Sequence, residues 1–398
     1  MLVPLQILGY DPSTWIVLLI AAFAGGAFGA ALGALPAFIF TGFMVIAGET
    51  VNILGKSVGQ STSGEASTLG SVGITGSIAF GPVFSPAISF AGGAAAAAYA
   101  AKKGYIQSGF DYHNAKDIGF ALGTRPDVLV VGGVFGIIGL VLTQLSTAFS
   151  APWDPIAMGV VLSALIHRLV FGYSVVGYVK GGILDMGPFE REERRALTDA
   201  GTAAGGSGDT ATDGGAVDSS RFVVEPWLPH QYKWANVAAI GLFVGILAAF
   251  TALRTGSYFL AFGISAASLV FLNCGVDNIP VTHHISLPAS TAALAMLGFG
   301  AGGDGQPALQ SDALLSATDA ASGALGIPAA EMPVMALLVG GLFGMICALF
   351  GELFQRIFYA HGDTHWDPPA AAIVFGTFVI AVCYLAGVLP APGWVPIP

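Results

Sequence analysis

The sequence is poor in charged residues. Only 10% of its 398 residues are Asp, Glu, Lys or Arg, whereas 55% are hydrophobic, and the mean hydropathy is +0.76. An ordinary soluble domain carries about 25% charged residues, so these charges are too few to cover a surface that faces water. Most of the outer surface must face lipid, and the sequence therefore predicts an all-α integral membrane protein.

Cysteine and cationic residues are also scarce. The three cysteines, Cys274, Cys347 and Cys383, lie in or beside apolar stretches, which indicates packing positions rather than a disulfide framework. The 14 Lys and Arg against 24 Asp and Glu give a formal net charge of −10, which argues against a nucleic-acid partner. The acidic stretch 199–219, rich in Thr, Gly and Ala, resembles soluble stretches in proteins of salt-loving archaea.

Motifs of soluble enzymes are missing from the sequence. It contains no P-loop, no Rossmann fingerprint and no HExxH string. Its glycine-rich strings lie inside apolar segments, where small residues let helices approach closely. We therefore expect no enzyme, no cofactor and no bound metal. The first 12 residues also lack the basic region of a cleavable signal peptide.

Ten apolar segments are candidates for membrane spans, because a transmembrane helix needs about 20 mostly apolar residues. They cover about 14–34, 36–54, 79–101, 127–149, 155–178, 235–253, 257–273, 280–300, 332–355 and 368–389.

The distribution of Lys and Arg predicts the orientation in a cell membrane. Basic residues follow the third segment, separate the fifth from the sixth, and follow the ninth, whereas the loop 301–331 has none. Cytoplasmic loops carry the excess of Lys and Arg. The rule places both termini outside and the linker 186–230 in the cytoplasm, with only Lys56 and Arg254 on the wrong side.

Three signatures recur in the same order in both halves of the chain. VGGVFG at 131–136 matches VGGLFG at 339–344, and each is followed by Trp-Asp-Pro. Upstream of these strings, Pro82-Val83 precedes Ile88-Ser89 in the first half, and Pro280-Val281 precedes Ile285-Ser286 in the second. Five segments per half is an odd number, so the second half enters the membrane from the opposite side. The sequence thus predicts two inverted five-helix repeats, 1–185 and 231–398, joined by the acidic low-complexity linker 186–230, which begins with a short surface helix at 189–195.

The repeated Pro-containing segments 81–90 and 277–290 are the candidate binding site. Proline interrupts a helix, and a helix that begins inside the membrane presents polarised N–H groups to a cavity. An ordinary helix start with proline in its first turn is the alternative. The candidate substrate-binding or ion-binding residues are Ser85, Pro86, Ser89, Asp277, Thr282, His283, His284, Ser286 and Pro288.

Other ionisable residues allow two interpretations each. Glu49 and Glu352 lie in or near apolar segments and could be proton or cation ligands, or they could cap the interface. His361, Asp363 and His365 alternate as metal ligands can, but the other repeat lacks both histidines and the first aspartate, so a polar cytoplasmic loop is the favoured interpretation. The Trp-Asp-Pro motif fits a structural helix cap, with Asp before the helix and Pro at its first position.

Two short words of the sequence resemble a known family. Residues 54–60 (LGKSVGQ) and 286–289 (SLPA) are similar to pieces of the multi-span subunits of the archaeal sodium-translocating methyltransferase, and that resemblance implies a sodium pathway. The count of five plus five helices also resembles urea-transporter-like channels.

We expect a transporter or channel for a small solute or ion, as a homodimer or homotrimer in the lipid bilayer. The alternatives are a membrane subunit of an ion-translocating or enzyme complex, and a scaffolding protein.

Overall fold

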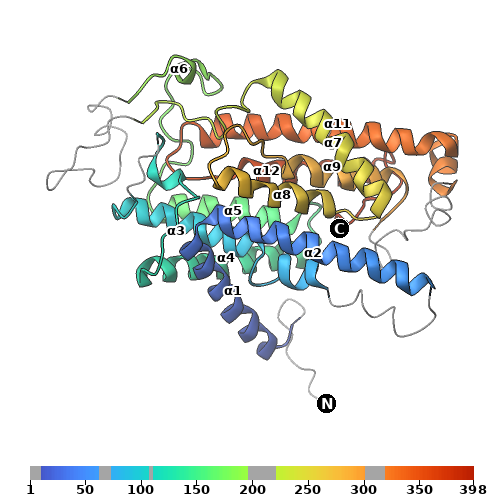
Figure 1. Ribbon diagram of the computed structural model, residues 1–398, viewed down its shortest axis with the longest axis horizontal. Coiled ribbons are helices and arrows are strands. Elements are labelled where there is room, and N and C mark those ends of the chain that lie inside the picture. Colours follow the sequence, from blue (N-terminus) through green and yellow to red (C-terminus); the bar gives the residue numbers. More distant parts are fainter. Residues whose placement is uncertain (1–9, 62–72, 107–110, 196–220, 301–318) are drawn as a thin grey trace.

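The computed structural model describes residues 10–61, 73–106, 111–195, 221–300 and 319–398 (Figure 1). Within these ranges the regular structure is helical, apart from two isolated β-bridges, which agrees with the all-α prediction. The first half forms one side of the molecule and the second half the other (Figure 1).

All ten predicted ranges contain helix. The first half contributes α1 (Pro12–Leu32), α2 (Ala34–Ser61), the π-helical turns η2 (Ile74–Ala79) and η3 (Pro86–Phe90), α3 (Ala91–Lys102), the 3-10 turn η4 (Asn114–Lys116), α4 (Pro126–Ala148) and α5 (Pro155–Val170). After the short α6 (Gly187–Glu190), the second half contributes α7 (Trp234–Thr255), α8 (Leu260–Asn273), α9 (His283–Met296), η5 (Ala329–Glu331), α11 (Met332–Phe354), η6 (Gln355–Tyr359) and α12 (Pro368–Leu385).

Six of the described helices are long and apolar enough to cross a membrane. They are α1, α2 over 34–55, α4, α7, the continuous stretch 329–359 that includes α11, and α12. The third and eighth predicted segments do not form full-length helices. η3 and α3 together cover only 86–102, α9 has 14 residues, and non-helical chain precedes Pro86 and His283. The α5 and α8 helices are also shorter than a full span.

Aspartates set the starts of three helices. Asp11, Asp154 and Asp367 precede α1, α5 and α12, and in each case the side chain accepts backbone N–H groups of the first turn. A proline follows each aspartate at the first helical position. Its ring holds φ near the helical value, and the N–H that it lacks would have no partner within the helix at that position. The structure thus gives both copies of Trp-Asp-Pro the capping role that the sequence indicates.

Glycine contacts hold α1 against α4 and α7 against α11. A Cβ atom added to Gly26 would lie 2.1 Å from the carbonyl oxygen of Gly132, and one added to Gly245 would lie 2.6 Å from that of Gly340. Gly132 and Gly340 occupy the same place in VGGVFG and VGGLFG. These strings therefore bring two helix backbones into direct contact, as small residues do in membrane helices.

Two pairs of helices join the halves, and both pairs run antiparallel. Gly42 of α2 faces Ala266 and Ala267 of α8, whereas Val45, further along α2, faces Gly263, which lies earlier in α8.

The second pair is α5 and α12. The backbone N–H of Asp154, before α5, donates to Thr377 Oγ1 late in α12 at 2.9 Å. Ala164, later in α5, packs with Trp366 before α12. The apolar core lies between these four helices and includes residues of both halves.

The described flanks of the linker pack onto the protein. Met186, Val223, Val224 and Tyr232 form a buried cluster with Ala360. The sequence predicts a surface helix at 189–195. The structure has the shorter helix α6 instead, which begins at Gly187 and ends at Glu190, and turns follow it. The low-complexity stretch 196–220 lies outside the described residues.

Candidate functional site

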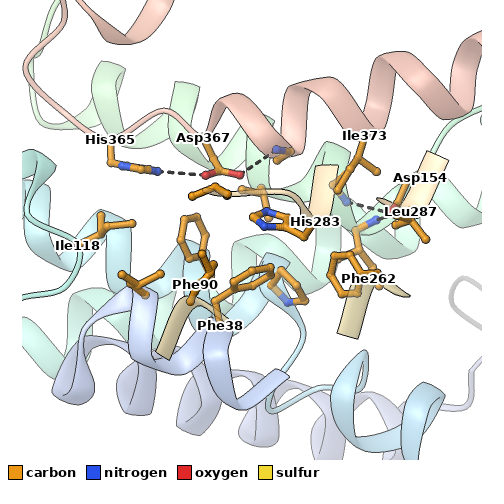
Figure 2. Close-up of a pocket in the computed structure, with 18 of the residues that line it drawn as sticks. Phe38, Phe90, Ile118, Asp154, Phe262, His283, Leu287, His365, Asp367 and Ile373 are labelled. Atoms are coloured by element: carbon orange, nitrogen blue, oxygen red, sulfur yellow. Dashed lines mark hydrogen bonds and ion pairs between the residues drawn. The ribbon is translucent and has the colours of Figure 1, made fainter. Parts of the chain in front are cut away.

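A cavity of about 670 Å³ lies between the two halves. Its walls come from α2, η3, α5, α8, α9 and α12, with the loop 116–120 and the linker flank at one end (Figure 2). We call the end near Lys116, Trp227 and Tyr359 the linker end. The opposite end contains Thr147, Phe259 and Trp394.

The middle of the cavity is apolar and aromatic. Phe38 lies between Phe90 and Phe262, with ring centroids 5.9 and 6.0 Å away, and Leu287 and Ile373 complete the wall (Figure 2). A water-filled pathway for ions is not favoured by such a lining, since dewetting closes hydrophobic constrictions.

His283 is one of two histidines in this aromatic surround, and the other, His365, lies against Phe90. The His283 ring lies 4.7 Å from that of Phe38 and 5.9 Å from that of Phe262, centroid to centroid. The side chain is buried, and its Nδ1 has no hydrogen-bond partner among the described residues. The unpaired Nδ1 is itself enclosed by protein atoms, whereas the side chain as a whole forms part of the cavity wall.

Both Pro-containing segments enter the protein as non-helical chain and become helical next to the cavity. η3 begins at Pro86 and α9 begins at His283, and both residues line the cavity. Neither Ser85 nor Thr282, the residues just before these helices, makes a side-chain cap. The structure thus brings the two predicted segments to one cavity.

The other predicted residues of these segments lie away from the cavity wall. Ser89 Oγ donates to the carbonyl oxygens of Phe84 and Ser85, Thr282 Oγ1 bonds with Ser265 Oγ at 3.0 Å, and Ser286 Oγ donates to the carbonyl oxygen of His283. These hydroxyls are satisfied inside the protein.

Three more candidate residues point elsewhere. His284 packs against the ring of Trp227, about 100° around the helix from its neighbour His283. Pro288 is buried beside Gly376. Asp277 is exposed.

Two cavity residues were missed as site candidates. Asp154 and Asp367 both line the cavity in addition to capping α5 and α12 (Figure 2). The sequence interpretation assigned the motif to structure alone. A signal was present, because the repeat places both carboxylates at equivalent helix starts, and carboxylates within membrane segments are functional candidates by default.

The linker flank closes one end of the cavity. Trp227 and Leu228 line the cavity there, and the backbone N–H of Trp227 donates to Gln355 Oε1 at 3.1 Å. Gln231 exchanges two hydrogen bonds with the backbone of Val281, just before α9. The flank is therefore tied directly to one of the Pro-containing segments.

A buried ion-pair network anchors the flank. Lys116 Nζ and Glu225 Oε2 are 2.6 Å apart, and both side chains are 0% exposed. Arg221 contacts Glu225 at 3.0 Å and Asp363 at 2.7 Å. Burial lowers the pKa of Lys116 to about 8, although the Glu225 carboxylate opposes that shift. The network joins the first half, the linker and the second half.

The family comparison covers nearly all of this architecture. The model of a family of unknown function, DUF7973, matches residues 10–398. The chain belongs to DUF7973. No curated protein and no solved structure matches it. The DUF7973 match includes both halves, the linker and every residue of the cavity, while the resemblances to the methyltransferase subunits and urea-transporter-like channels stay predictions.

Elsewhere in the DUF7973 chain, the two predicted glutamates lie outside the cavity wall. Glu49 Oε1 accepts from Thr75 at 2.8 Å and from Asn52 at 3.0 Å, and its Oε2 accepts from Ser257. Glu352 pairs with Arg356 at 2.6 Å. Both carboxylates already have donors from the protein.

The alternating stretch near α12 does not gather its side chains at one point. His361 Nε2 contacts the carbonyl oxygen of Ile183, Asp363 pairs with Arg221, and His365 Nε2 contacts Asp367. Among the described residues, no group of three His, Cys, Asp or Glu side chains could hold a metal ion.

Proposed function

We propose that this DUF7973 protein is a membrane carrier for a small solute, which binds in the cavity between the halves. The observation that carries the proposal is the cavity itself: it lies at the junction of the two halves, both Pro-containing segments reach it, and His283 at the start of α9 forms part of its wall. Binding sites of inverted-repeat transporters lie at such a junction.

The proposal includes the inverted repeat. Gly26 lies against Gly132 and Gly136, and Gly245 lies against Gly340 and Gly344, so the same positions of the repeated strings make the same contacts. Equivalent helices meet in antiparallel pairs, α2 with α8 and α5 with α12. This arrangement supports a pseudo-two-fold axis in the membrane plane, which relates the two halves.

A carrier fits the cavity better than an open channel. Phenyl rings occupy its middle, and Trp227 and Leu228 close the linker end. Solute release on that side would require the flank or the halves to move. Alternating access by one half rocking against the other supplies such a motion in inverted-repeat carriers.

An ion-translocating membrane subunit is the second candidate, and Glu49 is the observation that favours it. Its buried carboxylate meets hydroxyl oxygens of Thr75 and Ser257, and the latter belongs to the other half. Carboxylate and hydroxyl oxygens suit hard cations. If this reading holds, Glu49→Gln should abolish sodium-dependent activity and leave solute binding in the central cavity unchanged.

The proposed orientation has the linker in the cytoplasm and both termini outside. Cys274, exposed at the end of α8, should then resist an impermeant maleimide in intact expressing cells and react after permeabilisation. In a variant that lacks the native cysteines, Asp319→Cys should react from outside and Lys103→Cys should not; both positions are exposed. Labelling of Lys103→Cys in intact cells would reverse the orientation.

Access to the cavity tests the carrier function. In the cysteine-free background reconstituted in liposomes, His283→Cys should react with a small methanethiosulfonate reagent, because position 283 lines the cavity. The matched control is His284→Cys, whose position packs against Trp227 and should react at least about tenfold more slowly. A scaffolding protein predicts equal, negligible rates at both positions, and that result would remove the carrier proposal.

A further inference from the structure

The two equivalent aspartates at the cavity differ in one respect. Asp367 uses one carboxylate oxygen to cap α12, and its other oxygen contacts His365 Nε2 at 3.1 Å. The residue two positions before Asp154 is Pro152, which has no donor side chain. Asp154 Oδ1 accepts the N–H groups of Ile156 and Ala157, and its Oδ2 has no hydrogen bond among the described residues.

Asp154 is therefore an unusual buried carboxylate. Its exposed fraction is only 7%, and it lines the cavity (Figure 2). An ionised carboxylate taken out of water is costly unless a partner compensates its charge. The two N–H groups of the cap stabilise one oxygen, and the other oxygen of this cavity-lining residue has no such partner in the described chain.

No cation of the protein is free to compensate this charge at the cavity wall. Of the charged residues that line the cavity in the described chain, Asp117, Asp154 and Asp367 are acidic and Lys116 is basic. Two histidines, His283 and His365, also line it, and His365 already contacts Asp367. Lys116 is already paired with Glu225 at 2.6 Å. The wall thus carries an excess of negative charge at a site lined by few polar groups.

The rest of the wall suits an apolar body attached to a cation. The Phe38, Phe90 and Phe262 rings line its middle, and Phe259 and Trp394 pack together at the end away from the linker, 5.4 Å between centroids. Aromatic rings attract cations at their faces, most strongly where water is excluded. A volume of about 670 Å³ lies in the range that encloses a drug-sized molecule.

From these observations we propose that the solute is an organic cation: a protonated amine with an apolar or aromatic body. Its ammonium group donates to Asp154 Oδ2, and its body lies among the phenyl rings. This inference rests on the proposed carrier function and names the substrate class for the same cavity.

Three probes with the same 2-phenylethyl group and different charge test the assignment on the purified full-length protein. They are 2-phenylethylamine as the cation, 2-phenylethanol as the neutral isostere and 3-phenylpropionate as the anion, measured by calorimetry in detergent at pH 7. The amine should bind at least about tenfold more tightly than either of the others, which corresponds to 1.4 kcal/mol.

Asp154→Asn should weaken amine binding at least about tenfold and leave the size-exclusion profile unchanged, because Asn is as good a helix cap as Asp. Asp154→Ser provides a second capping variant, should the first not fold. The control is Asp127→Asn, which removes a carboxylate that contacts Tyr99 and Tyr105 outside the cavity and should leave amine binding unchanged.

The outcomes separate this inference from the carrier proposal. Tighter binding of the alcohol or the acid, no binding of the amine, or amine binding unchanged by either Asp154 variant overturns the cation assignment, even where His283→Cys is reached by reagent and the carrier proposal stands. If His283→Cys is also unreactive, both proposals fail.

Discussion

Replacing Glu225 by Gln is expected to cost about 3–5 kcal/mol of unfolding free energy. Glu225 pairs with Lys116 and Arg221, and the Lys116 and Glu225 side chains are wholly buried. The substitution keeps the shape and removes the charge, which leaves the Lys116 ammonium buried without its counter-ion. The measurement is denaturant unfolding of the purified protein in mild detergent.

Glu193→Gln is the matched control. Glu193 also contacts two cations, Arg191 at 2.8 Å and Lys180 at 3.6 Å, but all three side chains are partly exposed. Exposed ion pairs contribute about 0–1 kcal/mol, so this variant should change stability by less than that. Adding Lys116→Met to Glu225→Gln should recover part of the loss, since the uncompensated charge is then gone. Equal costs for the two Glu→Gln variants would contradict the anchoring role.

The same ion pair explains what the sequence could and could not predict. Glu225 and Lys116 are 109 positions apart, and nothing local marks either as buried. The flank around Glu225 looks like part of a polar linker, and only the folded chain shows that it closes the cavity. Burial of a charged residue follows from a partner elsewhere in the chain, which periodicity and composition do not reveal.

Features set by neighbouring residues were predictable. The helix starts at Asp154 and Asp367 depend on a side chain and backbone N–H groups two or three residues apart, so Trp-Asp-Pro was enough to find them. The apolar segments likewise marked ranges that contain helix, and six of the described helices are long and apolar enough to cross a membrane. The helix lengths were not predictable, because Pro82, Pro86 and Pro280 allow either a helix start or a break, and the tertiary contacts decide between them.

The placement of the site was predictable only as a pair of segments. The repeat indicated that 81–90 and 277–290 share a role, and Pro86 and His283 do reach one cavity. The choice between His283 and His284 depends on the rotation of α9 about its axis. The role of Asp154 at the cavity depends on how deep α5 begins, and a helix cap in the sequence carries no such information.

Replacing Gly26 by Ala should cost about 1–3 kcal/mol and lower the yield of monodisperse protein. A Cβ there would lie 2.1 Å from the carbonyl oxygen of Gly132, a backbone atom that cannot turn away. The α1 and α4 helices would have to separate, and overpacking of this kind is destabilising. Intrinsic helix propensity alone predicts the opposite change in stability, because Ala is favoured over Gly by about 1 kcal/mol in a helix.

The equivalent substitution in the second half and an open position complete the test. Gly245→Ala should also destabilise, and by less, because its Cβ would lie 2.6 Å from the Gly340 carbonyl oxygen. Gly76→Ala, in η2, meets no atom within 4 Å and should be neutral or slightly stabilising in the same unfolding measurement. If Gly26→Ala behaves like Gly76→Ala, the helices are not in backbone contact. If only one of Gly26 and Gly245 is sensitive, the two halves do not use the repeated strings in the same way, and the proposed two-fold relation loses its main support.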